Sequence, residues 1–245
     1  MKKMLWALVL LCAVGFGDQA GAGLFDDLLK ELPGIKSGVS QSGPDQDTTI
    51  SGLKEALAIG TENAVRAVSK TDGYFGNSMV KILLPEKLRK VADLVAKLGF
   101  QKQVDALTLS MNRAAEAAAP KATSLFVDAV KAMTFEDARK ILQGGDTAAT
   151  EYFRGKTSKK LYDEFKPVVV ENMNKVGVAK AYKAMMSPAE NIPLIPRESV
   201  DLDHYVTDKA LEGLFLMVGE EEKKIRTNPT ARVTDLLKTV FGKSP

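Results

Sequence analysis

The pattern of residues 101–118 is that of an α-helix with apolar side chains on two opposite faces. Counted at about 3.6 residues per turn, one face carries Val104, Leu107, Met111, Ala114, Ala115 and Ala118, and the opposite face carries Ala106, Leu109 and Ala117. A helix that is apolar all round has neighbours all round. We therefore predict that this Ala-rich helix lies in the middle of a helical domain.

Helical spacing of apolar residues continues along most of the chain, and strand-like alternation is scarce. Two such stripes comprise Leu53, Leu57, Gly60, Ala64 and Val68, and, after Pro85, Leu88, Val91, Val95 and Leu98. Residues 74–84, around Gly76 and Asn77, fit either a loop or one small hairpin. The predicted fold class is all-α, a single multi-helix globular domain over residues 50–245.

Cap-forming residues mark several helix boundaries. Thr134 with Asp137 is a capping box, which predicts a helix from there to Leu142. Residues 187–190 repeat this device over a shorter piece. Residues 228–242 have the cap, the first-turn proline and the terminal glycine of a last helix.

Residues 144–146, Gly-Gly-Asp, lie between two helical patterns. Glycines before a helix N-terminus can present free amides to a phosphate or another anion. The interpretation we favour is a helix corner, in which a glycine ends one helix and Asp146 caps the next. A carboxylate then already occupies the position that an anion would take.

The N-terminus has the three parts of a secretory signal peptide. Lys2 and Lys3 precede an apolar run over residues 5–11, and Ala20 and Ala22 provide the small side chains that signal peptidase reads. The apolar run is too short to span a bilayer. We predict cleavage after Ala22, so that residues 1–22 are removed and the mature protein is periplasmic or secreted.

The predicted leader also holds the only cysteine, Cys12. Lipid attachment there is not expected, because Leu11 stands where lipidation needs a small residue. The mature chain then has no thiol for a disulfide, a thiolate metal site or a cysteine nucleophile. Since the leader holds two of the 34 basic and one of the 31 acidic residues, the mature chain is nearly neutral. That balance argues against binding to nucleic acid.

Residues 23–49 separate the leader from the domain. Within them, residues 24–32 have leucines at the spacing of a short amphipathic helix, which Pro33 and Gly34 end. Residues 33–49 have the composition of a flexible tether. The short helix is expected to dock on its own domain, on a partner or on a membrane surface.

Charged residues on two helices are predicted to form one buried polar network. Arg113 falls between two apolar residues and needs a carboxylate partner, and Glu222 falls near the centre of an apolar stripe. The predicted members are Arg113, Glu116, Glu221, Glu222 and Arg226. Two interpretations stay open: a structural ion-pair network, or a polar binding or acid/base site.

His204, the only histidine, has few partners for catalysis or metal binding. Asp201, Asp203 and Asp208 lie nearby in sequence, yet acidic residues are favoured in a first helical turn in any case. Four ligands are not visible at a binding spacing, so we predict no metal and no cofactor. With one histidine and no cysteine in the mature chain, the Ser/His/Asp and Cys/His catalytic arrangements lack most of their members. No nucleotide-binding motif occurs.

Four methionines are candidates for an apolar pocket, because methionine side chains adapt to the shape of a ligand. They are Met111, Met185, Met186 and Met217. The alternative is that they belong to the ordinary core.

Four segments together resemble the bacterial family catalogued as domain of unknown function 4197. They are residues 51–57 (SGLKEAL), 111–116 (MNRAAE), 141–150 (ILQGGDTAAT) and 221–226 (EEKKIR). The resemblance covers residues 50–242 and implies an exported helical protein of the bacterial envelope. It implies no established activity, cofactor or catalytic residue.

Three classes of function remain open on the sequence. The leading hypothesis is a non-enzymatic envelope protein that binds a partner protein or an apolar small molecule in a cleft between Ala-lined helices. The second is an enzyme that uses Glu116, Glu221 or Glu222 with Arg113. The third is a structural or assembly component.

Overall fold

The computed structural model describes residues 46–189 and 200–227, and every regular element within these two ranges is a helix. In chain order the elements are α2 (Gln46–Ser69), α3 (Glu86–Val95), η1 (Ala96–Phe100), α4 (Gln101–Ala118), η2 (Ala119–Lys121), α5 (Ala122–Lys131), α6 (Phe135–Gln143), α7 (Ala148–Lys175), α8 (Val178–Met186), η3 (Ser187–Ala189) and α9 (Leu202–Thr227). The predicted all-α class is confirmed.

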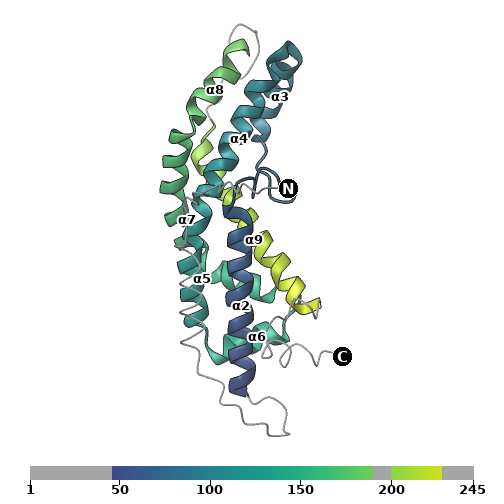
Figure 1. The fold of residues 1–245 in the computed structure, drawn as a ribbon, viewed down its shortest axis with the longest axis vertical. Coiled ribbons are helices and arrows are strands. Elements are labelled where there is room, and N and C mark those ends of the chain that lie inside the picture. The colour runs from purple at the N-terminus through teal and green to yellow at the C-terminus, as the bar shows by residue number, and fades with distance from the viewer. Residues whose placement is uncertain (1–45, 190–199, 228–245) are drawn as a thin grey trace, which may run out of the picture.

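The helices form an elongated bundle (Figure 1). α7, with α8 above it, runs along one long side, and α3 lies beside the first turns of α4 at the upper end. The lower part contains α2, α5 and α6, and α9 descends into it from beside α4. α4 packs against α7, α8, α9 and α2, which gives it the central position that its composition predicts.

The core lies along one face of α4, where Leu107, Met111 and a row of alanines are inaccessible to solvent. The opposite face differs from the prediction, because Ala106 and Ala117 are exposed. Alanine has the highest helix propensity of all residues, so an exposed alanine still stabilises the helix. The alanines of the buried face leave no cleft, since the neighbouring helices cover them completely.

Aromatic rings join the helices of the lower core. Phe126 of α5 meets Phe153 of α7 at 5.2 Å and Phe215 of α9 at 6.2 Å between ring centroids, edge to face in both pairs. All three rings are buried. Such pairs add specific geometry to the burial of apolar area.

The capping box at α6 is confirmed. The Thr134 hydroxyl accepts from the Asp137 backbone N–H at 3.1 Å, and Asp137 Oδ2 accepts from the Thr134 backbone N–H at 3.2 Å. The predicted role of Asp146 is wrong, because α7 begins after Thr147 and Asp146 makes no cap bond to it. The carboxylate at the start of α7 comes instead from Glu222, as described below.

Residues 70–85 form a succession of turns between α2 and α3, with no strand. Of the two alternatives for residues 74–84, the loop is therefore the one that occurs. We call residues 70–85 the anchored loop. Pro85 precedes the first residue of α3, as its fixed φ favours.

Several predictions fall on residues that the structure does not describe. They are the leader (1–22), the short helix and most of the tether (23–45), and the last helix (228–242). The first described helix begins at Gln46, slightly before the predicted domain boundary at residue 50. Among the described helices, none combines the length and the apolar character needed to cross a bilayer.

Candidate functional site

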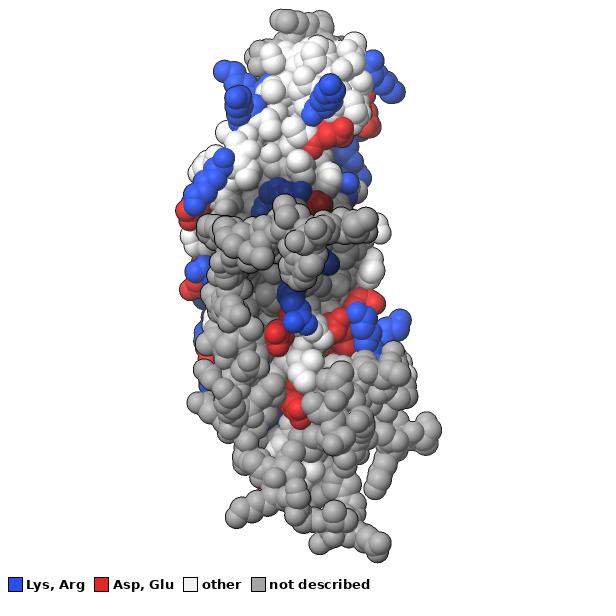
Figure 2. Space-filling view, in the orientation of Figure 1, with Lys and Arg blue, Asp and Glu red and all other residues white. Residues whose placement is uncertain are grey.

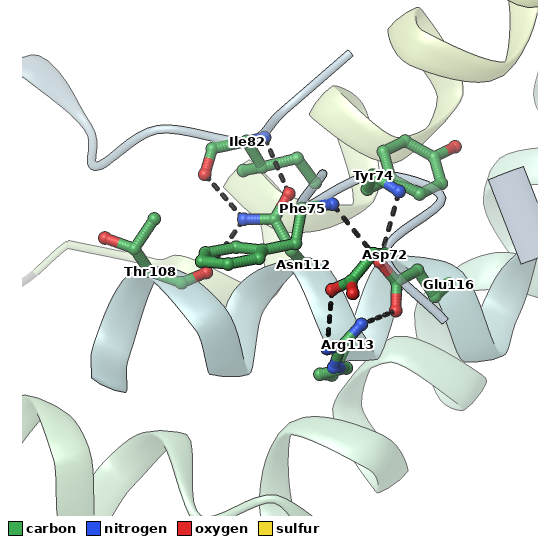
Figure 3. Close-up of polar contacts among 8 residues, drawn as sticks. All are labelled: Asp72, Tyr74, Phe75, Ile82, Thr108, Asn112, Arg113 and Glu116. Atoms are coloured by element: carbon green, nitrogen blue, oxygen red, sulfur yellow. Dashed lines mark hydrogen bonds and ion pairs between the residues drawn. The ribbon is translucent and has the colours of Figure 1, made fainter. Parts of the chain in front are cut away.

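Three residues of α4 hold the anchored loop against the bundle (Figure 3). Glu116 Oε1 accepts from the backbone N–H groups of Tyr74 at 3.1 Å and Phe75 at 3.2 Å. Its other oxygen, Oε2, accepts from Arg113 Nη1 at 2.6 Å. The Glu116 side chain is only 4% exposed, so its charge is balanced inside the fold.

Arg113 bridges two carboxylates. Besides Glu116, it reaches Asp72 Oδ1 through Nη2 at 2.7 Å. The hydrogen bond to Glu116 is the main cause that raises the pKa of the Arg113 guanidinium above its ordinary value. The predicted carboxylate partnership of Arg113 is thus present, but Asp72 was not predicted, because only the path of the loop brings it to α4.

Asn112 binds the second half of the anchored loop. Its Oδ1 accepts from the backbone N–H of Ile82, and its Nδ2 donates to the backbone carbonyl of Ile82, both at 2.8 Å. Nδ2 also donates to the carbonyl of Thr108 at 2.8 Å. The Asn112 amide therefore pairs with the loop backbone as a neighbouring strand would, and satisfies groups that burial would otherwise leave unpaired.

Tyr74 anchors the loop to α9. Its ring is completely buried, and its hydroxyl donates to the carbonyl of Ala210 at 2.6 Å. Burial, with a smaller contribution from the charge of Glu116, raises the pKa of Tyr74 well above its ordinary value. α9 accommodates the ring through Gly213, where an added Cβ would lie 2.8 Å from Tyr74 Cε1.

A second polar group joins α9 to the start of α7. Glu222 Oε1 accepts from the Ala149 backbone N–H at 2.9 Å and from Arg226 Nη2 at 2.8 Å, while Oε2 accepts from the Thr150 backbone N–H and hydroxyl, each at 2.8 Å. Arg226 Nη2 also donates to the Ile141 carbonyl at 3.0 Å. The Glu222 carboxylate is therefore the anion at this helix N-terminus.

The five residues predicted as one network lie in separate groups. Arg113 and Glu116 bind the anchored loop, whereas Glu222 and Arg226 bind the corner between α6 and α7. Glu221 accepts from Asn63 Nδ2 of α2 at 3.2 Å and from Lys224 Nζ at 2.6 Å. Among the described residues, no hydrogen bond or ion pair connects the first group to the second.

Both groups have the character of structural locks. The carboxylate oxygens of Glu116 and Glu222 receive donors from backbone, hydroxyl and guanidinium groups, so little acceptor capacity is left for a ligand. Within the described ranges, every buried side-chain nitrogen and oxygen atom has a hydrogen-bond partner. A satisfied network of this kind fixes one arrangement of the chain.

An open groove lies between the anchored loop and α9, with a volume of about 470 Å³. Its lining residues are Met79, Val80, Lys81, Ile82, Leu83, Arg89, Arg154, Tyr205, Lys209, Glu212, Gly213 and Leu216. We call it the loop groove. The Tyr205 hydroxyl donates to the Leu83 carbonyl at 2.8 Å, which fixes the loop side of the groove to α9.

The loop groove combines exposed apolar side chains with positive charge. Met79, Leu83 and Leu216 are 52%, 54% and 42% exposed. The lining cations are Lys81, Arg89, Arg154 and Lys209, against one carboxylate, Glu212, which Lys209 neutralises. Sequence analysis missed this site, because its residues come from three distant segments and carry no common motif.

Lys81, Arg89 and Arg154 have no carboxylate partner among the described residues. Lys81 Nζ lies 4.1 Å from the centroid of the Phe75 ring, and the Arg154 guanidinium lies 4.6 Å from that of Phe215. Contacts with ring faces hold Lys81 and Arg154 in place, and a hydrogen bond from Arg89 Nε to the Leu84 carbonyl at 3.3 Å holds Arg89. None of these contacts neutralises the cation. The groove therefore keeps a positive potential that favours an acidic ligand.

The methionines predicted to line a pocket belong to the core instead. Met111 and Met185 are completely buried, and Met186 and Met217 pack against the core. None of the four lines the loop groove. The physical reason is the dense packing of the interior, in which a flexible side chain fills space between helices.

His204 binds a tyrosine and an aspartate on the surface. Its Nδ1 lies 2.6 Å from the Tyr162 hydroxyl, and its Nε2 lies 3.1 Å from Asp208 Oδ2. Asp201 accepts from the His204 backbone N–H at 2.9 Å, which is a helix-capping role. In the part of the chain that the structure describes, no three His, Cys, Asp or Glu side chains converge as metal ligands would.

Comparisons with known proteins give a family and nothing finer. No curated protein and no solved structure matches the chain. The family model described as "Protein of unknown function (DUF4197)" matches residues 43–242, which include both polar locks, the anchored loop and the loop groove. The chain therefore belongs to the DUF4197 family.

Proposed function

We propose that this protein is a non-enzymatic binding module of the bacterial cell envelope, and that the loop groove binds an acidic, partly apolar segment of a partner protein. The observation that carries the proposal is the combination, in one groove, of three exposed apolar side chains with three cations that have no carboxylate partner among the described residues. Exposed apolar side chains gathered at one place are typical of interaction sites.

The rigidity of the loop supports a binding role. Asn112, Glu116 and Tyr205 fix its backbone at Ile82, at Tyr74 and Phe75, and at Leu83. Met79 and Leu83 are thus held at the groove before any partner arrives. A preorganised surface loses less conformational entropy on binding than a flexible one.

The open form of the groove favours a protein segment over a small molecule. Small-molecule sites enclose most of the ligand surface, whereas Met79, Leu83 and Leu216 each keep more than two fifths of their surface exposed. An extended or helical segment can cover such side chains and place its carboxylates beside Lys81 and Arg89.

The enzyme hypothesis loses its main support in this arrangement. Glu116 and Glu222 do not share a cleft, and each already accepts hydrogen bonds from several protein groups. A general base needs an acceptor site that faces the substrate. We therefore assign both carboxylates to the stability of the fold.

Site-specific photo-crosslinking in the cells that naturally produce the protein tests the groove. A photo-crosslinking amino acid at Leu216 is expected to capture a protein of defined mass. Lys81→Glu with Arg89→Glu is expected to abolish capture, because it reverses the charge of the groove. The matched controls are the crosslinker at Val176, which is 41% exposed against 42% for Leu216, and charge reversal at Lys159 and Lys160.

Equal capture at Leu216 and Val176, or capture that survives charge reversal at Lys81 and Arg89, would contradict the proposal.

Native mass spectrometry of the purified protein, before and after organic extraction, tests the alternative that the groove binds a small molecule. An added mass that disappears on extraction would assign the groove to a small molecule. Light scattering tests the alternative of an assembly component, which a strictly monomeric protein would contradict.

The envelope location rests on the signal-peptide pattern of residues 1–22 and on the exported character that the resemblance implies. Cell fractionation with mass determination of the intact chain tests it. We expect the protein outside the cytoplasm, with Gly23 as its first residue. A cytoplasmic protein that retains Met1 to Ala22 would contradict the location and leave the groove proposal untouched.

A further inference from the structure

The corner between α3 and α4 exposes two apolar side chains. Gly99 turns the chain there with φ of 92°, and an added Cβ would meet no atom within 4 Å. Leu98 and Phe100, on either side of it, are 51% and 37% exposed. The corner lies at the upper end of the bundle in Figure 1, where α3 and α4 pack beside α8, and both apolar side chains are exposed.

Few large apolar side chains are exposed among the described residues, and Leu98 and Phe100 are two of them. The described residues include seven exposed large apolar side chains, of which three line the loop groove and two lie at this corner. The corner is thus a second concentration of exposed apolar surface, far along α4 from the lock at Arg113 and Glu116. Isolated exposed apolar residues need no explanation, whereas adjacent ones indicate an interaction site.

Two lysines lie closest to the corner. Lys97 precedes Leu98, Lys102 follows Phe100 by two residues, and both are exposed, whereas the nearest carboxylates in sequence, the exposed Asp93 and Asp105, lie farther from the corner on either side. Figure 2 shows Lys and Arg side chains on both flanks of an uncharged surface at this end of the molecule, with Asp and Glu side chains beside those on the right flank. The arrangement is an apolar corner flanked by two lysines.

We propose that this corner inserts into an anionic membrane surface, with Leu98 and Phe100 in the boundary of the acyl chains and with Lys97 and Lys102 at the lipid phosphates. Charge selects this occupant. Interfacial segments combine apolar side chains with lysines that reach the headgroups. A second copy of the chain would bring the same two lysines to the contact.

A local probe distinguishes the corner from the rest of the chain. The full chain carries an environment-sensitive fluorophore at Leu98→Cys in a Cys12→Ser background. Vesicles of phosphatidylglycerol and phosphatidylcholine are expected to shift its emission to the blue, and pure phosphatidylcholine vesicles are not. Lys97→Gln with Lys102→Gln is expected to weaken partitioning by about tenfold or more, since each lysine near an anionic surface contributes measurably.

Controls at the opposite end of the molecule sharpen the test. The same fluorophore at Phe135→Cys, a position 47% exposed on α6, is expected to show no shift. In unlabelled protein, Leu98→Ser with Phe100→Ser is expected to lower the fraction that sediments with vesicles, and Lys159→Gln with Lys160→Gln is not.

Three results would overturn the proposal. They are an absence of shift at position 98, an equal shift at position 135, and partitioning that the lysine substitutions leave unchanged. A shift that grows with protein concentration and without vesicles would instead assign the corner to self-association.

Discussion

Glu222 holds both hydrogen-bond donors of Thr150: its Oε2 accepts from the backbone N–H and from the hydroxyl, each at 2.8 Å. The two residues lie 72 positions apart, so the first turn of α7 receives its cap from α9 rather than from its own sequence neighbours. A carboxylate at this position satisfies free amides and complements the helix dipole. The bond thus stabilises α7 and fixes α9 on it at once.

Glu222→Gln tests the strength of this lock. The substitution keeps the size of the side chain but removes the charge that balances Arg226, whose side chain is only 17% exposed. We expect the free energy of unfolding to fall by about 2 to 3 kcal/mol in urea denaturation. Glu220→Gln, two residues earlier and outside the lock, is the control and should change it by less than about 0.5 kcal/mol. Equal effects of the two substitutions would refute the lock.

Asn112→Ala tests the attachment of the anchored loop. It removes the partners of both the N–H and the carbonyl of Ile82, which are buried. We expect a loss of about 3 kcal/mol, because each unsatisfied buried group costs about 1 to 3 kcal/mol. Hydrogen exchange at the Ile82 amide should accelerate. Asn172→Ala, which removes one bond within α7, is the control and should leave loop exchange unchanged.

Features that depend on one helical turn could be predicted from the sequence. The capping box of Thr134 and Asp137 involves neighbours three residues apart, and the pair of Glu222 and Arg226 involves neighbours four apart. The burial of Glu222 follows from its place in an apolar stripe. In each case the helix geometry alone brings the groups together.

Features that depend on the level of a residue along the bundle could not be predicted. Periodicity places Arg113 between apolar residues and Glu222 in an apolar stripe, but it does not show that the first lies by the anchored loop and the second by the start of α7. Hence the five residues of one predicted network lie in separate groups in the structure. The loop groove is hidden for the same reason, since Lys81, Arg154 and Leu216 line one groove only after the anchored loop, α7 and α9 have packed.

The pH dependence of the α6 cap follows from Asp137. The hydrogen bond from the Thr134 hydroxyl, with that from the Thr134 backbone, lowers the pKa of Asp137 below its ordinary value. A carboxyl whose pKa is lower in the folded state stabilises the fold above its unfolded pKa and loses that contribution as pH falls through its folded pKa. Asp137→Asn should therefore destabilise the protein at pH 7, and the difference from the parent should vanish in strong acid.

Urea denaturation of both proteins between pH 7 and acid pH measures this difference. Thr134→Ala removes the other half of the box and should cost about 1 kcal/mol at pH 7. Asp128→Asn, at an exposed carboxyl of α5, is the control for general loss of negative charge. A difference between Asp137→Asn and the parent that is the same at every pH would contradict the role of the ionised carboxylate.

Two glycines in helices should respond to alanine with opposite signs. At Gly213 of α9 the new Cβ would lie 2.8 Å from Tyr74 Cε1 and 3.1 Å from Val80 Cβ. The Tyr74 ring cannot move away, because it is buried and its hydroxyl donates to the Ala210 carbonyl. At Gly155 of α7 the new Cβ would meet nothing within 4 Å. Gly155→Ala should stabilise the protein by about 1 kcal/mol through helix propensity alone.

Gly213→Ala gains the same propensity but must displace Tyr74 and the anchored loop, and overpacking a core costs about 1 to 3 kcal/mol. We expect a net loss of about 1 kcal/mol or more in urea denaturation, with weaker photo-crosslinking from Leu216 because the loop side of the groove moves. A stabilising Gly213→Ala would mean that the loop yields easily. The rigid presentation of Met79 and Leu83, on which the groove proposal depends, would then be lost.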